Sequence, residues 1–371
     1  MRILQVIPTL GTGGAEKMVL EITERLNRSG VRTDLLLLND TPSPLLDRAR
    51  AAGIRVHVTG SGDLRGIYDP RHIFRIRPFL EGYDVVHAHL TAAQYWCALS
   101  RLTLRRGAHL VTTEHSPRNR RFGKWYFRLA DRFVYSLFGR IIAISADTAC
   151  ALQSYIGLPP EGIELIENGI DLPAYRGALP YPRAELTGDP RCETLLLQVA
   201  GFRNEKDHDT VIRALGLLPE SVHLALAGDG IRRPVLESLC AEYDVERRVH
   251  FLGVRTDVPR LLRSADILLV SSHWEGLSLA CVEGMASGTP LVASDVRGVR
   301  ELAGGNGLLF REGDERELAH RVTSLLGDPS LRRLVSTRCA EKALRYDINK
   351  VINRHKELYR ALTRRKPTAI R

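Results

Sequence analysis

Short apolar runs alternate with longer segments of helical periodicity along most of the chain. In the first half, buried-strand patterns cover residues 3–7, 34–38, 55–58, 84–88, 109–113, 140–144 and 163–166. Helical patterns such as 15–26 and 92–104 lie between several of these runs. Apolar strands separated by helices are typical of a mostly parallel sheet covered on both faces. The pattern therefore predicts a doubly wound α/β domain.

The alternation breaks near residues 172–191 and then resumes. Prolines and glycines interrupt any long element in this segment, so we expect it to link two domains; they are Pro173, Gly177, Pro180, Pro182, Gly188 and Pro190. A second series of strand patterns follows at 195–200, 222–227, 249–252, 267–270, 291–293 and 307–310. We predict two Rossmann-like domains, residues 1–175 and 190–350, and a final helical segment, residues 351–371.

Length and composition agree with this division. A chain of 371 residues exceeds one ordinary core, and 44% hydrophobic with 26% charged residues is typical of a soluble globular protein. The sequence contains no run of 18 apolar residues, so we expect no membrane span. The first residues predict a strand rather than a signal peptide. The six cysteines are far apart and lack metal-ligand spacing, which indicates a reducing compartment, most simply the cytoplasm.

The formal charge of +10 is unevenly distributed. Residues 101–140 contain ten Lys or Arg but only two acidic residues, and between 118 and 128 the cations alternate with aromatic residues. Such a stretch suits anionic lipid headgroups or an acceptor that carries a diphosphate. A solvated basic helix face is the structural alternative. Nucleic acid is the weakest interpretation, because no recognition motif accompanies the charge.

The densest candidate chemistry lies between the strand patterns at 267–270 and 291–293. Glu275 and Glu283, eight residues apart, flank the expected start of a helix near Ser278. The free amides of Ser278, Leu279 and Ala280 can face an anion. One carboxylate on each side of an anion pocket suits a ligand with hydroxyls at both ends and phosphate in the middle, such as a nucleotide sugar. The structural alternative is a capped helix with two solvated glutamates.

Three further segments follow strand patterns and carry candidate residues. Gly13 and Gly14 open the first helix, where glycines let backbone amides approach a phosphate or sugar closely. This is not the full dinucleotide fingerprint, so a dehydrogenase is a weak alternative. Lys206 and Arg203 follow the strand at 195–200, and fixed cations there can stabilise a diphosphate leaving group. His115 ends the strand at 109–113, and Glu114 precedes it.

The segment 271–298 resembles the E-x7-E signature of the retaining nucleotide-sugar glycosyltransferases of family 4. The resemblance extends, in the family's order, to Gly13-Gly14-Ala15-Glu16, Glu114-His115, Ile166-Glu167-Asn168-Gly169-Ile170-Asp171 and Gly228-Asp229-Gly230. It implies the GT-B fold: two Rossmann-like domains that face each other across a cleft, with a last helix, near 352–362, that crosses back to the first domain.

The resemblance also implies roles for individual residues. Glu275 would bind hydroxyls of the donor hexose and Glu283 the ribose, while Lys206 and Arg203 would bind the diphosphate. The family's arginine commonly precedes its lysine by five residues, but here Arg203 precedes Lys206 by three. His115 would orient the hexose rather than transfer a proton. The remaining expected contacts are Gly13 and Gly14 towards the donor phosphates and the acceptor, and Gly228, Asp229 and Val254 around the base and ribose.

The implied activity is transfer of a hexose, with retained configuration, from a nucleotide sugar to a saccharide acceptor for a cell-surface polysaccharide. The resemblance favours a UDP-sugar donor and a lipid-linked acceptor. We expect no cofactor and no metal ion, since no D-x-D dyad sits where a cation would bridge a diphosphate. We expect a cytoplasmic protein that docks peripherally on an anionic membrane. The alternatives are a nucleotide-sugar 2-epimerase, a phosphorylase-like enzyme and an inactive relative that binds a nucleotide or glycan.

Overall fold

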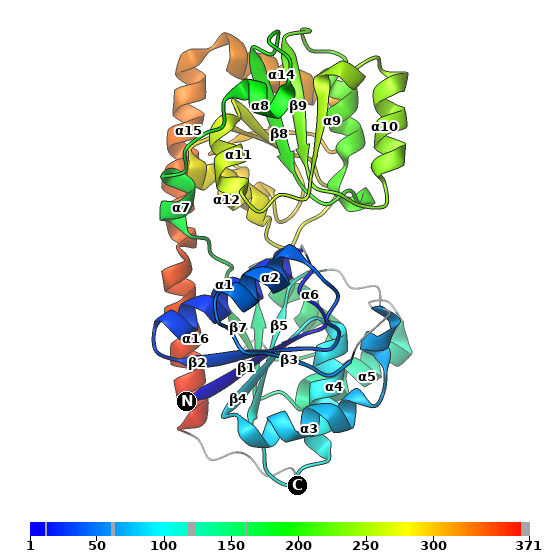
Figure 1. Ribbon diagram of the computed structural model, residues 1–371, viewed down its shortest axis with the longest axis vertical. Helices are drawn as coiled ribbons and strands as arrows, with labels where there is room; N and C mark the ends of the chain where they lie inside the picture. The colour runs from blue at the N-terminus through cyan, green and yellow to red at the C-terminus, as the bar shows by residue number, and fades with distance from the viewer. Residues whose placement is uncertain (12, 61–63, 118–123, 160–161, 365–371) are drawn as a thin grey trace. The chain divides into compact units, whose positions relative to one another are not determined.

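The computed structural model describes residues 1–11, 13–60, 64–117, 124–159 and 162–364. The chain forms two units (Figure 1). The first contains Met1–Asn168 and the residues from Asn349 onward, and the second contains Gly169–Ile348. Each unit is an α/β sandwich of its own.

The first unit contains a parallel sheet that, in the described part of the chain, has seven strands in the order β3-β2-β1-β4-β5-β6-β7. The strands are β1 (Arg2–Ile7), β2 (Arg32–Leu37), β3 (Val56–Val58), β4 (Val85–His89), β5 (His109–Glu114), β6 (Arg140–Ala143) and β7 (Ile163–Leu165). The helices are α1 (Gly14–Arg28), α2 (Pro44–Ala51), α3 (His72–Gly82), α4 (Thr91–Leu102), α5 (Trp125–Ser136), α6 (Ala146–Ile156) and α16 (Ile348–Thr363, whose first residue belongs to the second unit).

Alternate residues of the central strands supply two separate cores. Leu35 and Leu37 pack with side chains of α1 and α2, whereas Leu36 and Leu38 pack on the other face with side chains of α3 and α4. Successive side chains of a strand point to opposite faces, so a fully buried strand must be apolar throughout. This explains the continuous apolar runs that predicted these strands.

The second unit contains six parallel strands, within the described residues, in the order β10-β9-β8-β11-β12-β13. They are β8 (Thr194–Val199), β9 (Val222–Ala227), β10 (Val249–Gly253), β11 (Ile267–Val270), β12 (Leu291–Ser294) and β13 (Leu308–Phe310). The helices are α7 (Leu172–Arg176), α8 (Arg183–Thr187), α9 (His208–Leu215), α10 (Arg233–Glu242), α11 (Val258–Ser264), α12 (Leu279–Ser287), α13 (Arg300–Ala303), α14 (Glu315–Gly327) and α15 (Pro329–Ala343).

The fold prediction is confirmed: two parallel α/β domains are present, and every predicted strand occurs with ends shifted by at most two residues. The last helix returns to the first unit, where Tyr359 is fully buried. Each sheet reverses its strand order beside its first strand, between β1 and β4 and between β8 and β11. Ligands of open α/β sheets bind at such switch points, outside the carboxyl ends of the strands.

The expected linker at residues 172–191 differs from the structure. The chain passes from the first unit to the second after Asn168, and residues 172–191 form α7 and α8 of the second unit. Leu172, Tyr175 and Leu186 are buried in the second core. Prolines and glycines made the segment irregular, but its apolar side chains anchor it.

Helix α12 lies unusually close to β11 at Gly284. A Cβ built on Gly284 would overlap Cδ2 of Leu268, which is fully buried. Overpacking a core costs about 1–3 kcal/mol, whereas replacing a mid-helix glycine with alanine gains only about 1 kcal/mol of helix propensity. The close approach of helix and strand therefore depends on this glycine.

We predict that Gly284→Ala lowers the Tm of the second unit by about 2–4 °C for each kcal/mol of net destabilisation. Gly327→Ala, at the end of α14, is the matched control, because its Cβ would meet no atom within 4 Å. Thermal unfolding followed by circular dichroism measures both. An unchanged or higher Tm for Gly284→Ala would contradict the packing argument.

Candidate functional site

A partly buried ion pair occupies the switch point of the second sheet. Lys206 lies in the loop after β8, and Glu275 lies in the loop after β11. Nζ of Lys206 is 2.5 Å from Oε1 of Glu275, and the Ser272 hydroxyl donates to the same oxygen at 3.0 Å. The side chains are 27% and 12% exposed, respectively. A cation, a carboxylate and a hydroxyl therefore converge on one point.

The loop that carries Lys206 is held by side chains beneath it. Gln198 of β8 donates from Nε2 to the backbone oxygen of Lys206 at 2.8 Å. Asp207 has a left-handed backbone (φ 39°) and caps α9 by accepting from the Thr210 amide at 3.4 Å, and the same oxygen accepts from the Thr210 hydroxyl at 2.9 Å. Its second oxygen accepts from the Ser271 hydroxyl at 2.9 Å. These bonds fix the loops after β8 and β11 to each other.

The amino end of α12 faces the same small space. Ser278 is the N-cap but its side chain makes no capping hydrogen bond in the described structure. A cavity of about 20 Å³ is lined by Lys206, Glu275, Ser278 and Ala280, among others. Leu279 is the first helical residue, and Glu283 is buried one turn further on. Lys206, Glu275 and two residues at the start of α12 thus line one cavity, whereas Leu279 and Glu283 are not part of its lining.

Glycines bring the neighbouring turns into contact with this loop. A Cβ on Gly228 would overlap the backbone oxygen of Ala200, and the Phe202 amide donates to the Asp229 carbonyl at 3.0 Å. The Gly228 amide in turn donates to the Gly253 carbonyl at 2.8 Å. The turns after β8, β9 and β10 therefore form one connected edge. Val254, the next residue, is 45% exposed at that edge.

Arg203 extends from the Lys206 loop into solvent. Its side chain is 69% exposed, with a long contact of 4.0 Å to Glu205. The family's arginine commonly stands nearer the end of the strand. Here the residue before Arg203 is Phe202, which is fully buried and carries no charge. Arg203 is therefore free to turn towards an anion near Lys206.

His115 follows β5 in the first unit. Its Nε2 is 3.1 Å from Nδ1 of His89, and burial, then the nearby His355, lowers the pKa of His115 to about 4. The ring is therefore neutral at physiological pH. Glu114 is a buried anchor that accepts from Gln94 Nε2 at 2.6 Å and from the Tyr135 hydroxyl.

Gly13 and Gly14 begin α1, and Gly13 caps it without a side chain. A Cβ on Gly13 would overlap Oε2 of Glu16, so the Glu16 carboxylate lies against the glycine turn. A carboxylate in this position repels a phosphate and accepts a hydroxyl. The turn therefore suits a sugar better than the phosphate that the sequence also suggested.

Part of the basic stretch, Arg118, Arg120 and Arg121, lies outside the described residues. Across the residues that are described, no helix is both long and apolar enough to cross a bilayer. The same described residues include no cluster of three or more His, Cys, Asp or Glu side chains suited to a metal ion.

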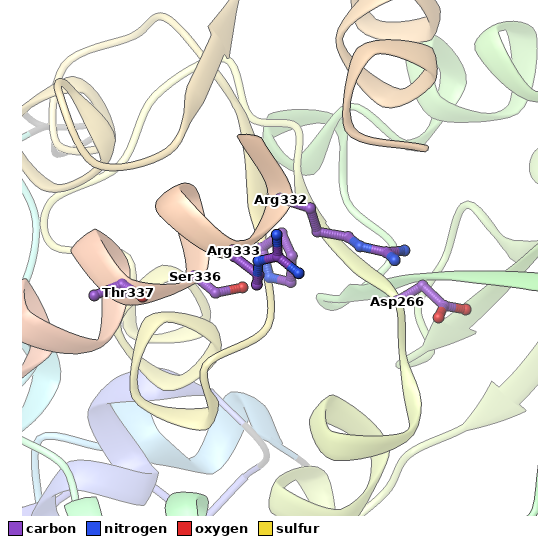
Figure 2. A pocket seen from close by; sticks show the side chains of 6 residues that line it. Asp266, Arg332, Arg333, Ser336 and Thr337 are labelled. Atoms are coloured by element: carbon purple, nitrogen blue, oxygen red, sulfur yellow. The ribbon is translucent and has the colours of Figure 1, made fainter. Parts of the chain in front are cut away.

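A second hollow, of about 440 Å³, lies at the opposite edge of the second sheet (Figure 2). It is lined by Arg332, Arg333 and Ser336 of α15 and by Asp266, which precedes β11. Asp266 is already bound to Arg183 at 2.7 Å. The hollow is at the amino ends of the strands, away from the Lys206 cavity.

Sequence reasoning missed Gln198, Asp207, Ser271 and Ser272. A signal was available for Gln198, because it is a single polar residue within the apolar strand β8. A buried polar side chain must find a hydrogen-bond partner, so such an interruption indicates a structural task. The sequence does not identify the partner.

Two α/β domains, each with a parallel sheet, are the architecture of the GT-B fold. Residues 12–173 match the model of "Glycosyltransferase Family 4", and residues 187–342 match that of "Glycosyl transferases group 1". The chain belongs to this family of glycosyltransferases.

Individual relatives are consistent with the family. A D-inositol 3-phosphate glycosyltransferase from Mycobacterium sp. (strain KMS) is 29% identical, over 86% of this chain and 80% of that protein. The N-acetyl-alpha-D-glucosaminyl L-malate synthase of Bacillus anthracis is 26% identical, over 75% of both chains. The crystal structure of Anabaena Alr3699/HepE in complex with UDP-glucose has a TM-score of 0.85 at 23% identity, covering 97% of this chain and 100% of that one.

Proposed function

We propose that the protein is a retaining hexosyltransferase that uses a UDP-sugar donor and a saccharide acceptor in cell-surface polysaccharide synthesis. The observation that carries the proposal is the Lys206–Glu275 pair beside the amino end of α12. A diphosphate requires positive charge and amides, and the hexose attached to it requires a hydroxyl acceptor. Lys206, Glu275 and the first residues of α12, which would meet these requirements, lie beside each other around one small cavity.

In this proposal, Lys206, Arg203 and the amides of Ser278, Leu279 and Ala280 bind the diphosphate. The bond from the anomeric carbon to the phosphate oxygen breaks, and the electron pair leaves with the nucleoside diphosphate. The oxygen of an acceptor hydroxyl forms the new bond on the same face of that carbon, and its proton passes to the departing phosphate oxygen. Fixed positive charge stabilises the charge that develops there and needs no reorganisation during the reaction. A covalent enzyme carboxylate is not required.

The two glutamates divide the rest of the donor. Glu275 binds hydroxyls of the hexose, next to the diphosphate held by Lys206, and Glu283 binds the ribose. Gly228, Asp229 and Val254 surround the base and ribose. UDP is favoured because the structurally similar Anabaena protein was crystallised with UDP-glucose.

On the acceptor side, the Gly13 and Gly14 turn with the Glu16 carboxylate suits a sugar hydroxyl. The acceptor that we propose is lipid-linked. A 2-epimerase or an inactive binding relative would not release a nucleoside diphosphate in proportion to a glycosylated product. Assay of released UDP with and without an acceptor therefore separates a transferase from these two alternatives.

Substitution of the glutamates tests the donor assignment. Glu283→Ala should weaken binding of UDP and intact UDP-sugar alike, whereas Glu275→Ala should leave UDP binding nearly unchanged. Glu275→Ala should lower kcat/KM by about ten- to a hundred-fold, because a charge-assisted hydrogen bond contributes about 1.5–3 kcal/mol. Calorimetry with UDP, GDP and ADP and steady-state kinetics measure these effects. The reverse pattern would exchange the two roles, and no effect of either would refute the site.

Activity should survive excess EDTA. Lys206, Arg203 and the α12 amides supply the positive charge that a divalent cation would otherwise bring to the diphosphate. Released UDP is measured before and after chelation. Loss of turnover that magnesium or manganese restores would show that the charge comes from a metal ion.

We also propose that the protein binds peripherally to an anionic membrane through the exposed side chains of α5. Its inner face places Val134 and Tyr135 in the core and also buries Asp131, which accepts from the hydroxyls of Tyr95 at 2.5 Å and Tyr155 at 2.9 Å. Its outer face exposes three large apolar side chains: Trp125, Leu129 and Phe133 are 74%, 62% and 50% exposed. Apolar side chains therefore lie on the solvent side of α5 as well as on its core side, unlike on an ordinary surface helix.

The outer stripe of α5 has the composition of an interfacial helix. Trp125, Leu129 and Phe133 recur every four residues and so share one face. Lys124, Arg128 and Arg132 alternate with them and are exposed. Aromatic side chains enter the headgroup region, and each cation contributes about 1 kcal/mol near an anionic surface.

Vesicle co-sedimentation should therefore require anionic lipid and weaken as salt rises, since the Debye length is about 8 Å at physiological ionic strength. Replacing Trp125, Leu129 and Phe133 with serine should abolish binding. Replacing Leu179 and Ile231, 76% and 92% exposed in the second unit, should not. Equal binding to neutral vesicles, or none to anionic ones, would contradict the proposal.

A further inference from the structure

A chain of buried hydrogen bonds connects the C-terminal helix to His115. The hydroxyl of Tyr359, on α16, lies 2.6 Å from Nδ1 of His87 and 3.3 Å from Nε2 of Gln5. Oε1 of Gln5 lies 2.7 Å from Nε2 of His89. Nδ1 of His89 lies 3.1 Å from Nε2 of His115. Tyr359, Gln5 and the His87 and His89 side chains are almost completely buried.

His87, His89 and His115, the histidines of this hydrogen-bond network, are neutral, so each has one donor nitrogen and one acceptor nitrogen. Burial, with the neighbouring histidines as a smaller cause, holds the pKa of His87 and His89 well below its ordinary value. The amide oxygen of Gln5 can only accept. The proton of His89 is therefore on Nε2, its Nδ1 accepts, and the proton of His115 must be on Nε2.

His115 is then left with a lone pair on Nδ1. This atom is enclosed and has no hydrogen-bond partner among the residues that the structure describes. An enclosed acceptor without a partner is unfavourable, and a donor from a ligand would satisfy it. His115 directly follows the carboxyl end of β5, the edge at which such sheets bind ligands.

We propose that Gln5, His89 and Tyr359 are positioning residues that fix the tautomer of His115, so that its Nδ1 accepts a hydrogen bond from a hydroxyl of the donor hexose. This inference rests on the proposed function for the identity of the ligand. Gln5 determines the direction of the whole chain. If its amide were rotated by half a turn, its nitrogen would donate to His89 Nε2, and the protons of His89 and His115 would both be on Nδ1. Nδ1 of His115 would then donate to a hydroxyl oxygen instead of accepting from a hydroxyl.

The nitrogen chemical shifts of His115 test the tautomer directly, without any assay of activity. The full chain is labelled with 15N-histidine, and the His115 resonances are assigned by their loss in His115→Asn. We expect Nε2 to have the shift of a protonated nitrogen and Nδ1 that of an unprotonated one at neutral pH. A protonated Nδ1, or shifts averaged between the two forms, would overturn the inference.

Tyr359→Phe tests the positioning role. It removes the group that holds the Gln5 amide, so the His115 shifts should become averaged and kcat/KM for release of UDP from UDP-glucose should fall about three- to ten-fold. The Kd for UDP, which has no hexose, should not change. Gln5→Met, which removes the amide itself, carries the same expectation if Tyr359→Phe does not fold.

The matched control is Tyr83→Phe. Tyr83 is a buried tyrosine of the same unit whose hydroxyl donates to Asp34 at 2.6 Å, outside the histidine chain. Its loss should reduce Tm but leave the His115 shifts and kcat/KM unchanged. If Tyr359→Phe affects only Tm, as Tyr83→Phe does, the chain is purely structural and the inference fails. Absence of turnover in the wild-type chain would instead refute the proposed function, whereas a protonated Nδ1 in an active enzyme would refute only the tautomer.

Discussion

The ion pair between Lys206 and Glu275 depends on the order of the strands. β9 and β10 lie on one side of β8, and β11 lies on the other, directly beside β8. The loops after β8 and β11, which are far apart in sequence, therefore lie next to each other. Both side chains are partly buried, and removal of one partner would leave the other with reduced hydration and without its counter-charge. Gly298, with φ 81°, allows a second segment to pass against the backbone oxygen of Glu275. The position of the carboxylate is thus fixed from several sides.

The two units prepare polar groups in opposite ways. The second unit places charged side chains beside the start of α12, whose first amides have no partner within the helix. In the first unit, burial keeps His89 and His115 neutral. What these histidines offer a ligand therefore depends on which ring nitrogen carries the proton and not on a charge. Charged groups bind phosphate strongly at any orientation, whereas a neutral acceptor distinguishes one hydroxyl position from another.

Much of the fold could be predicted from the sequence, because buried parallel strands must be apolar on both faces. The linker could not, since the prolines of residues 172–191 report local irregularity and not which core Leu172 and Tyr175 enter. Lys206, Glu275 and Ser278 lie together because each follows a strand at the same edge, and that much of the arrangement can be inferred from their positions after strand patterns. Gln198 and Gln5 were not found, because a single polar residue in a strand does not reveal its partner. The histidine chain joins residues more than 250 positions apart.

The return of α16 affects how the protein is made. The first unit needs Tyr359 to fill and hydrogen-bond its interior, yet the ribosome must first synthesise residues 169–348 of the second unit. At about 5–20 residues per second, that segment takes roughly 10–40 s. During this time Gln5 and His87 lack their partner hydroxyl. The unit that emerges first is therefore the last to be completed.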